Sequence, residues 1–327
     1  MSFPSVAAAY TPSAPYCLSY RDLEIGGVVS PLAGGLFANL ITLEGIGKPP
    51  LVVTDTQRDL DQGQFVGIDV RAGRTITAQF GVTPDLSNGP DSSLQDALDE
   101  LGYVFAPVGN TEYPLFLALP GGRLRACMAR LRRMDYKIDP AYVGLGSGVE
   151  SLGTGPSKGM AVVTIEWHAS DPRWYDTPTL DPTIGLPTFS TGIGFPIDFP
   201  VSFGTGSSAG VLTVVNDGPV EMRPRLIFTG PLTTPQASNA SIDGNPTLKF
   251  NVTLAAGDTL TVDTDWHTVT LETAGSSTPT SRVDTLVAGS TWWNLPPGPS
   301  TLQFTSGDSA STPGTMTVEY ASAWDAI

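Results

Sequence analysis

The stretch Met160–Tyr175 reads Met-Ala-Val-Val-Thr-Ile-Glu-Trp-His-Ala-Ser-Asp-Pro-Arg-Trp-Tyr, and the division of the chain is decided here. Its segment Val162–Trp167 is rich in β-branched and aromatic residues, which predicts a strand. Asp171-Pro172 ends that strand, because proline has no N–H to donate to a β-ladder. Beyond Tyr175 basic residues become rare, and Pro, Thr, Gly and Ser dominate. We therefore expect the last strand of one domain here, followed by the entrance to a second.

Composition limits the classes of protein to consider. The 327 residues suggest two domains, each large enough to bury its own core. The net charge of -15, from 17 Lys+Arg against 32 Asp+Glu, argues against a nucleic-acid-binding surface. Only 15% of residues are charged, and 36 Gly and 29 Pro favour many short strands and turns. The first twenty residues lack the basic and apolar parts of a signal peptide, and no apolar run approaches the roughly 18 residues of a membrane span. We expect no membrane insertion.

The first half predicts strands and one helix. Apolar alternation and apolar runs predict strands at Arg21–Ile25, Leu51–Thr54, Gly73–Phe80 and Leu115–Leu119. A helix is predicted over Ser93–Leu101, with a capping box from Ser92 and Gln95 and with Gly102 as its stop. Its apolar stripe consists of Leu94, Ala97, Leu98 and Leu101. The segment Arg123–Ile138 fits a helix or a strand, and periodicity does not decide between them.

The second half contains regularly spaced short strands. The runs are Val211–Val215, Leu226–Phe228, Leu248–Leu254, Thr259–Asp263, Thr268–Glu272, Leu302–Thr305 and Thr315–Tyr320. Turn signals such as Asn216-Asp217-Gly218-Pro219 and Ala256-Gly257-Asp258 separate them, and no helical stripe is visible. This pattern predicts a β-sandwich or jelly roll.

Catalytic patterns are sparse, and we expect no catalytic, metal or cofactor site. Gly206–Gly210 fits Gly-x-Ser-x-Gly, but a strand follows it where a nucleophile elbow needs a helix. The two histidines, His168 and His267, are too few and too far apart for a zinc site or a triad. The two cysteines, Cys17 and Cys127, are expected to be buried free thiols.

Two clusters suggest binding surfaces. Trp266, Trp292 and Trp293 could form a sugar-stacking platform or could pack in a core, and the adjacent pair must face opposite ways on a strand. Six of the 17 basic residues lie between Arg123 and Lys137. They are Arg123, Arg125, Arg130, Arg132, Arg133 and Lys137. Such a run is either a solvated strand face or an interface with an acidic neighbour.

Several motifs, in this order, resemble a known family. They are Asp61-Gln-Gly-Gln-Phe-Val-Gly67, Gly73-Arg-Thr-Ile-Thr77, Ala169-Ser-Asp-Pro-Arg-Trp-Tyr175 and Ser290-Thr-Trp-Trp-Asn-Leu-Pro-Pro-Gly298. Together they resemble distal tail proteins of long-tailed bacteriophages, and most closely the minor tail proteins of phages that infect actinobacteria. The Gly-rich loop Gly144–Gly159 and the Pro-rich segment Thr177–Pro200 depart from that pattern.

The resemblance implies a mainly β fold in three parts. Residues 1–175 would form a β-barrel-like domain with one helix, in which Arg123–Ile138 is a strand. Residues 176–200 would be a linker or edge segment, and 201–327 a galectin-like or jelly-roll sandwich resembling carbohydrate-binding modules, at the periphery.

The implied function is structural. Six copies would form a homo-hexameric ring at the virion tail tip, made in the cytoplasm of the bacterial host. The ring would join the tail tube protein to the tail hub, or tail-associated, protein, with receptor-binding proteins or a host surface glycan as further partners. DNA would pass through without specific binding. Because Lys and Arg would retain it, we expect a channel wall with acidic residues in excess. The first domain has Asp55, Asp59, Asp61 and Asp69 available, and the sequence leaves open which loops line the channel. Two rival functions are a carbohydrate-binding host adhesin and a glycan-degrading tail enzyme.

Overall fold

The computed structural model describes residues 11–12, 17–21, 23–26, 36–59, 62–84, 94–107, 109–138, 161–186, 210–276, 278–308 and 314–327. These residues fall into two compact units. The first unit runs to Thr177 and also contains Trp324–Ile327, whereas the second runs from Pro178 to Ala323. The chain therefore leaves the first unit, builds the second and returns.

An antiparallel sheet forms the body of the first unit, in the strand order β2-β1-β9-β10-β11-β8-β3. Its strands are β1 (Cys17–Tyr20), β2 (Leu23–Ile25), β3 (Leu36–Glu44), β8 (Arg74–Pro84), β9 (Tyr113–Ala118), β10 (Arg125–Ile138) and β11 (Ala161–Ala169). The short strand β12 (Trp174–Asp176) pairs with β10 and with β25 (Ala323–Trp324), through which the chain returns.

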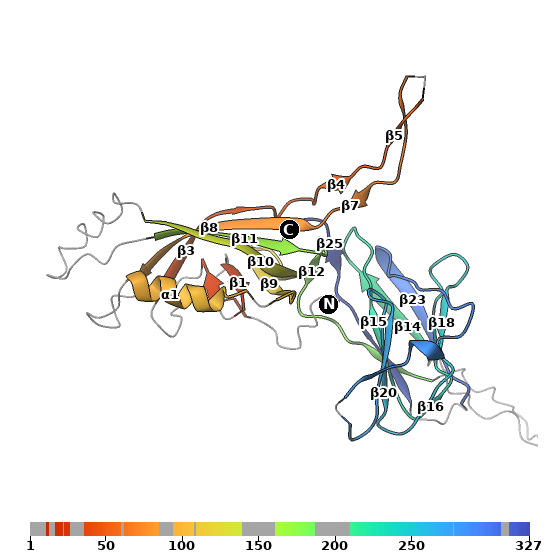
Figure 1. Cartoon of the computed structure of the whole chain (residues 1–327). Coiled ribbons are helices and arrows are strands. Elements are labelled where there is room, and N and C mark those ends of the chain that lie inside the picture. The colour runs from red at the N-terminus through yellow and green to blue at the C-terminus, as the bar shows by residue number, and fades with distance from the viewer. Residues whose placement is uncertain are drawn as a thin grey trace, which may run out of the picture. The chain divides into compact units, whose positions relative to one another are not determined.

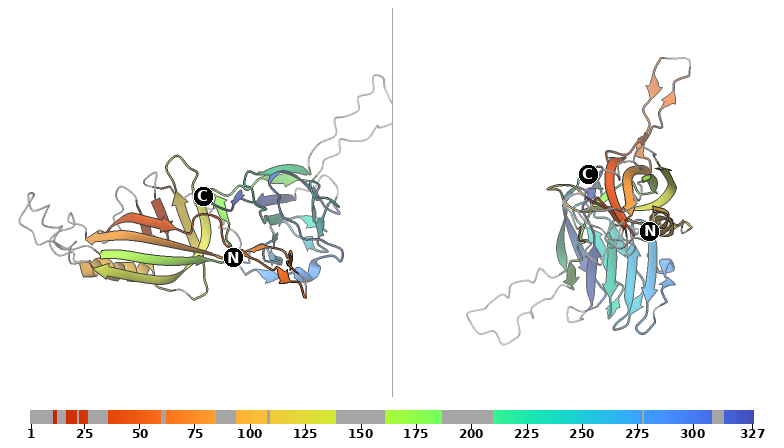
Figure 2. Two further views of the ribbon diagram at one scale, coloured as in Figure 1. Left: turned by 90° about the horizontal axis from the view of Figure 1, so that it is seen from above. Right: turned by 90° about the vertical axis from the view of Figure 1, so that its left-hand side faces the viewer.

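The core of the first unit lies on one face of this sheet. Residues of β11 alternate between buried and half-buried along the strand, and Val163, Ile165 and Trp167 are fully buried. The helix α1 (Leu94–Val104) lies across this face and buries Leu98 and Leu101 (Figures 1 and 2). This arrangement follows from the period-2 pattern of the strands and the i, i+3, i+4 stripe of the helix.

The helix prediction is confirmed, but its predicted stop is wrong. Gly102 lies inside α1, which continues to Val104. A glycine inside a helix costs about 1 kcal/mol relative to alanine, and burial of the Phe105 side chain directly after the helix offsets that cost. Ser92 of the predicted capping box lies outside the described residues, and the amide of Gln95 instead donates to the Asp99 carboxylate at 3.0 Å.

Between β3 and β8 the chain leaves the sheet as a long hairpin (residues 48–72), which we call the hairpin arm. In it β4 (Leu51–Val52) pairs with β7 (Val70–Arg71), and β5 (Thr56–Gln57) pairs with β6 (Gln64–Phe65). Figure 1 shows this arm extending away from the sheet. The expected strand Leu51–Thr54 is therefore only two residues long and belongs to the arm, not to the sheet.

Two antiparallel sheets build the second unit, with the orders β13-β24-β15-β20-β21-β22 and β14-β23-β17-β18. The first contains β13 (Thr183–Gly185), β15 (Arg225–Thr229), β20 (Thr259–Asp263), β21 (Thr268–Glu272), β22 (Thr280–Ser281) and β24 (Thr315–Glu319). The second contains β14 (Val211–Asn216), β17 (Gln236–Asn239), β18 (Thr247–Lys249) and β23 (Gly298–Thr305). A short pair, β16 (Leu232–Thr233) and β19 (Thr253–Leu254), and a 3-10 turn at Val283–Thr285 complete the unit.

Apolar side chains of the two sheets meet to form the core of the second unit. The ring of Phe228 on β15 lies 5.8 Å from that of Phe304 on β23 and 5.9 Å from that of Phe250. The mainly β fold and the β-sandwich predicted from the strand spacing are confirmed. The single strand predicted over Leu248–Leu254 is wrong, because Phe250 donates its N–H to Pro235 and Asn251 donates to Thr285, which divides the run into β18 and β19.

Candidate assembly surfaces

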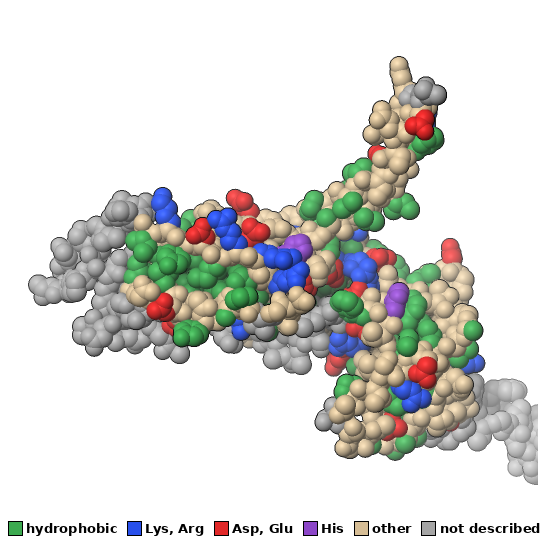
Figure 3. All heavy atoms as spheres, viewed as in Figure 1, with side chains coloured by type: hydrophobic (Ala, Val, Ile, Leu, Met, Phe, Trp, Pro, Cys, Tyr) green, Lys and Arg blue, Asp and Glu red, His purple; other side chains and the backbone are tan. Residues whose placement is uncertain are grey.

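Seven apolar side chains of the hairpin arm are exposed, with exposed fractions from 47% at Val52 to 92% at Val66. They are Leu51, Val52, Val53, Phe65, Val66, Ile68 and Val70. Figure 3 shows hydrophobic side chains along the arm. Exposed apolar patches mark surfaces that another molecule covers. The arm is therefore a candidate assembly surface.

The arm is ordered by its own polar contacts. The N–H of Gly67 donates to the Asp55 carboxylate at 2.8 Å, and the Thr54 hydroxyl donates to the carbonyl of Ile68 at 2.7 Å. The Arg58 guanidinium lies 5.0 Å from the centre of the Phe65 ring. These contacts tie the two legs together while leaving their apolar side chains exposed. Ordering the arm before binding lowers the entropy that a partner must remove.

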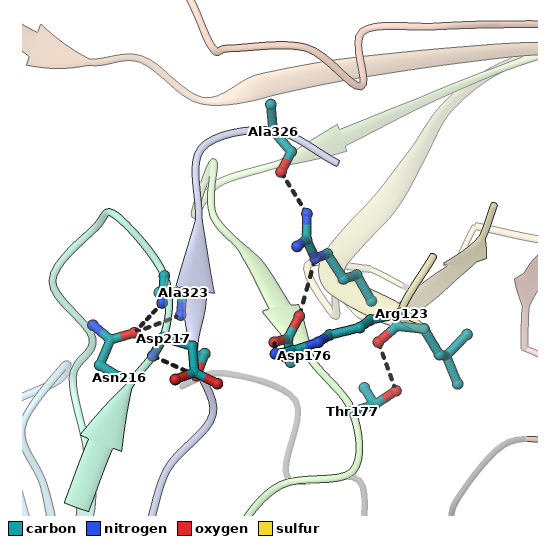
Figure 4. A network of polar contacts seen from close by, with 11 residues as sticks. Arg123, Asp176, Thr177, Asn216, Asp217, Ala323 and Ala326 are labelled. Atoms are coloured by element: carbon teal, nitrogen blue, oxygen red, sulfur yellow. Dashed lines mark hydrogen bonds and ion pairs between the residues drawn. The ribbon is translucent and has the colours of Figure 1, made fainter. Parts of the chain in front are cut away.

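The basic segment predicted as an interface begins with two arginines that have partners inside the first unit. Arg123 and Arg125 each place a guanidinium nitrogen 3.0 Å from the Asp176 carboxylate (Figure 4). Arg125 also donates to the carbonyl of Ala326 at 2.8 Å, and its guanidinium lies 4.0 Å from the centre of the Trp324 ring. With only 12% of its side chain exposed, Arg125 holds the returning chain instead of facing a neighbour.

The later part of the same segment is exposed. On β10, Arg133 binds Asp135 at 2.7 Å, with both side chains more than half exposed. Among the described residues, Arg132 and Lys137 have no carboxylate partner, and both are exposed. Arg130 is half-buried, and its Nε is buried without a hydrogen-bond partner in the described structure. The six basic residues therefore do not form one surface, and Arg132 and Lys137 remain the candidates for a contact between protomers.

A buried arginine, which the sequence patterns did not predict, lies at the base of the hairpin arm. Arg74 is 1% exposed, and burial lowers the pKa of its guanidinium. The guanidinium donates to four backbone carbonyls, those of Gly45, Gly47, Pro172 and Asp325. The Trp174 ring lies 5.5 Å from it. No local pattern marks such a site, because all four acceptors are main-chain groups from distant segments.

The two cysteines of the chain are packing residues. Cys17 and Cys127 are buried free thiols, as expected, and burial raises the pKa of Cys127. A thiol held in its neutral form is a packing residue rather than a nucleophile. Within the described ranges, no group of three or more His, Cys, Asp and Glu side chains could hold a metal ion. No described helix is long and apolar enough to cross a membrane.

The three tryptophans proposed for sugar stacking lie in different environments. Trp266 is 58% exposed in the turn between β20 and β21. Trp292 is half-buried, and the ring of His267 stacks on it with centroids 4.5 Å apart. Trp293 is 4% exposed, so its indole cannot stack on a ligand. Trp293 is therefore a core residue, whereas Trp292, directly before it in the chain, is half-buried.

Comparisons with known proteins bear on both units. Residues 217–324 match the family model of the siphovirus-type tail component, C-terminal domain. This match supports the predicted resemblance to distal tail proteins of siphophages. A search of curated proteins found no match.

Solved structures extend the likeness across the chain at the level of the fold. The crystal structure of the SPP1 Dit (gp 19.1) protein is described as a paradigm of the hub adsorption apparatus in phages that infect Gram-positive bacteria. It is 13% identical, covers 94% of this chain and 98% of its own, and has a TM-score of 0.58. Chains of the phage P2 baseplate in its activated conformation with Ca and with Sr are each 12% identical, with TM-scores of 0.46 and 0.45. They cover 95% and 93% of this chain and 99% and 97% of their own.

Proposed function

We propose that this chain is a structural protein of a siphophage tail tip, and that copies of it assemble into a closed six-membered ring. The observation that carries the tail assignment is the match of residues 217–324 to the siphovirus-type tail component model. The fold shared with SPP1 Dit over 94% of the chain supports it. The ring would join the tail tube protein to the tail hub, and its copies would be synthesised in the host cytoplasm. We also propose that the chain is related most closely to the minor tail proteins of phages that infect actinobacteria.

The hairpin arm supports assembly through the first unit. Seven exposed apolar side chains on one projecting arm would be costly to a protein that stayed monomeric, because each keeps apolar surface in water. A neighbouring copy that covered them would remove that cost. A stable interface buries about 800 Å² per partner, and an extended arm can supply such an area without a deep pocket. The arm would then reach across to the next protomer in the ring.

A structural role is favoured over the two rival functions. The comparisons support a non-enzymatic tail protein, and they do not favour an adhesin or a glycan-degrading enzyme as the main function. Receptor-binding proteins would be further partners of the assembled ring, as the family resemblance implies.

Native mass spectrometry and negative-stain electron microscopy of the purified full chain test the proposal. We expect the mass of six copies and a ring with six-fold symmetry. The double substitution Val66→Asp with Ile68→Asp should shift the mass to that of the monomer, because it places two charges in the apolar contact. The two side chains are 92% and 79% exposed, so the fold of the monomer should be unaffected.

A matched control is Val283→Asp, in the second unit, where the side chain is 49% exposed. It should leave the ring intact. A chain that is monomeric at tens of micromolar, and that immunolabelling does not find at the tail tip, would refute the proposal. A double variant that assembles normally would remove the hairpin arm from the interface and leave the tail assignment standing.

A further inference from the structure

The turn between β20 and β21 presents a large aromatic side chain to solvent. Trp266 is 58% exposed, and His267 directly after it is also exposed. Trp266 is the single aromatic residue among the exposed large apolar side chains in the described part of the second unit. Figure 3 shows a histidine beside hydrophobic side chains on the surface of this unit. Because tryptophan is usually largely buried, its exposure on a surface turn requires a reason.

The turn is held rigidly beneath Trp266. One oxygen of the Asp263 carboxylate accepts the N–H groups of Asp265 and Trp266 at 2.9 and 3.1 Å. Thr264 donates from both its N–H and its hydroxyl to the carbonyl of Pro224, at 3.3 and 2.7 Å. The carboxylate of Asp265 forms an ion pair with Arg223. The indole is therefore presented on a fixed backbone, which lowers the entropy lost when a ligand binds.

An aromatic pair is formed by the residue that follows Trp266 in the chain. His267 has a φ of 52°, in the left-handed region, where residues other than glycine are uncommon and often functional. Its ring lies nearly parallel to that of Trp292, at 18° and 4.5 Å. The loop that carries Trp292 is fixed by a hydrogen bond from the Thr291 N–H to Thr247 at 2.9 Å. The stack of His267 on Trp292 thus connects the turn that carries Trp266 to the loop that carries Trp292.

We propose that Trp266, His267 and Trp292 form a binding platform for a neutral saccharide. The apolar face of a pyranose ring packs on an indole, while its hydroxyl groups find donors and acceptors in side chains such as those of Asp265 and Arg223. This site is separate from ring assembly and does not depend on it. The structural tail protein would then carry a weak glycan contact of its own.

Charge and size favour a neutral sugar over other ligands. From Asp176 onward the chain has 4 basic and 14 acidic residues, so an anionic wall polymer or nucleic acid would be repelled. A protein partner would need an area of about 800 Å² per side. A single exposed tryptophan with one stacked pair matches the faces of one or two sugar rings instead.

Saturation-transfer NMR and intrinsic tryptophan fluorescence, with a panel of neutral di- to tetrasaccharides of glucose, galactose and mannose, test this platform. We expect at least one saccharide to bind the full chain with a Kd in the millimolar range. Trp266→Ala should weaken that binding by about tenfold, as expected for the loss of an aromatic stacking contact. Trp266→Tyr should restore most of it, because a ring is again present.

The control is Val283→Ala, an exposed apolar residue on the same unit, which should bind as the unmodified chain does. Circular dichroism and native mass must be unchanged in every variant, so that loss of binding is distinguished from loss of fold or of assembly. Absence of binding to every saccharide in the panel, or equal binding by Trp266→Ala, overturns the proposal. Either result leaves the proposed tail function untouched.

Discussion

The two ends of β10 use the same kind of residue in opposite ways. At its beginning, Arg125 is enclosed by Asp176, the Ala326 carbonyl and the Trp324 ring. Further along, Arg132 and Lys137 are exposed and have no described carboxylate partner. The burial pattern of the strand changes between these ends, from buried residues up to Ala129 to mostly exposed residues beyond Leu131. One run of basic residues in the sequence is therefore a structural tie at one end and an open cationic surface at the other.

The role of each cation in such a cluster depends on its own position in the fold. A cluster in the sequence says only that cations are close along the chain, whereas their role depends on what the fold brings opposite each one. A buried arginine satisfied by an ion pair and a carbonyl stabilises the unit that contains it. An exposed cation contributes little to stability and is available to a partner. The following experiments separate the two.

The largest expected effect is on stability. Arg125→Ala should lower the free energy of unfolding by about 2–4 kcal/mol, because it removes a largely buried ion pair, a hydrogen bond and the packing on Trp324. Arg132→Ala should change it by no more than about 0.5 kcal/mol. Urea unfolding followed by tryptophan fluorescence measures both. If the two substitutions lowered the free energy of unfolding equally, the proposed difference between the two ends of β10 would be wrong.

The next effect is on assembly. Reversing both exposed cations, with Arg132→Glu and Lys137→Glu, should reduce the fraction of assembled ring several-fold, because opposite charges across the contact would become like charges. Raising the salt concentration should reduce the difference in assembled fraction between this variant and the unmodified chain, because salt screens the exposed charges. We do not reverse Arg130, because its buried Nε would confound assembly with stability.

Lys249→Glu with Arg282→Glu, in the second unit, makes the same change in net charge and serves as the control. Sedimentation velocity at low and high salt reports the assembled fraction. If the β10 variant and this control assemble alike, the exposed cations are merely solvated, and the interface proposal for this end of the strand is abandoned.

The smallest effect concerns the wall of the channel that the proposed ring would enclose. We expect acids to exceed bases there, because Lys and Arg would bind DNA phosphates and retain the DNA. Up to Tyr175 the chain has 13 basic and 18 acidic residues. Asp55, Asp59 and Asp69 lie on the hairpin arm, and Asp61 lies outside the described residues. An electron cryo-microscopy map of the assembled ring would show which acidic and basic side chains line the wall. An excess of Lys and Arg would contradict this prediction, and Arg132 and Lys137 among them would also end their proposed role between protomers.

Local sequence patterns predicted those strands and that helix whose tertiary packing matches the local pattern. The β-branched and aromatic run Val162–Trp167 predicted a strand, and in β11 (Ala161–Ala169) every second residue is buried in the core. The stripe of α1 gave a helix for the same reason, although Gly102 did not end it. In β10, where helix and strand patterns competed, the family resemblance gave the strand, and pairing with β9 and β11 stabilises it.

Local sequence patterns did not predict features that depend on contacts with segments far away in the sequence. The run at Leu51 resembles any buried strand, and nothing in it says that it leaves the sheet. The acceptors of Arg74 are carbonyls, which carry no sequence signal. The sequence identified Trp266, Trp292 and Trp293 as candidates for a binding surface. The fold shows that Trp266 is the one with an exposed side chain, on a turn held by Asp263. Sequence therefore identified candidate residues for the surfaces, while the fold decided which of them face outward.

The return of Trp324–Ile327 to the first unit has a consequence for synthesis on the ribosome. Arg71 binds the Asp325 carboxylate at 2.7 Å, Arg74 binds the Asp325 carbonyl, and Arg125 binds that of Ala326. These partners are translated only after the whole of the second unit. A nascent chain that has emerged as far as Thr177 thus lacks the Asp325 partner of Arg71 and one backbone acceptor each of Arg74 and Arg125. Their other partners, such as Asp176 for Arg125, are already present. The first unit is therefore completed only after the second has been translated, and a chain interrupted before Trp324 would lack these contacts.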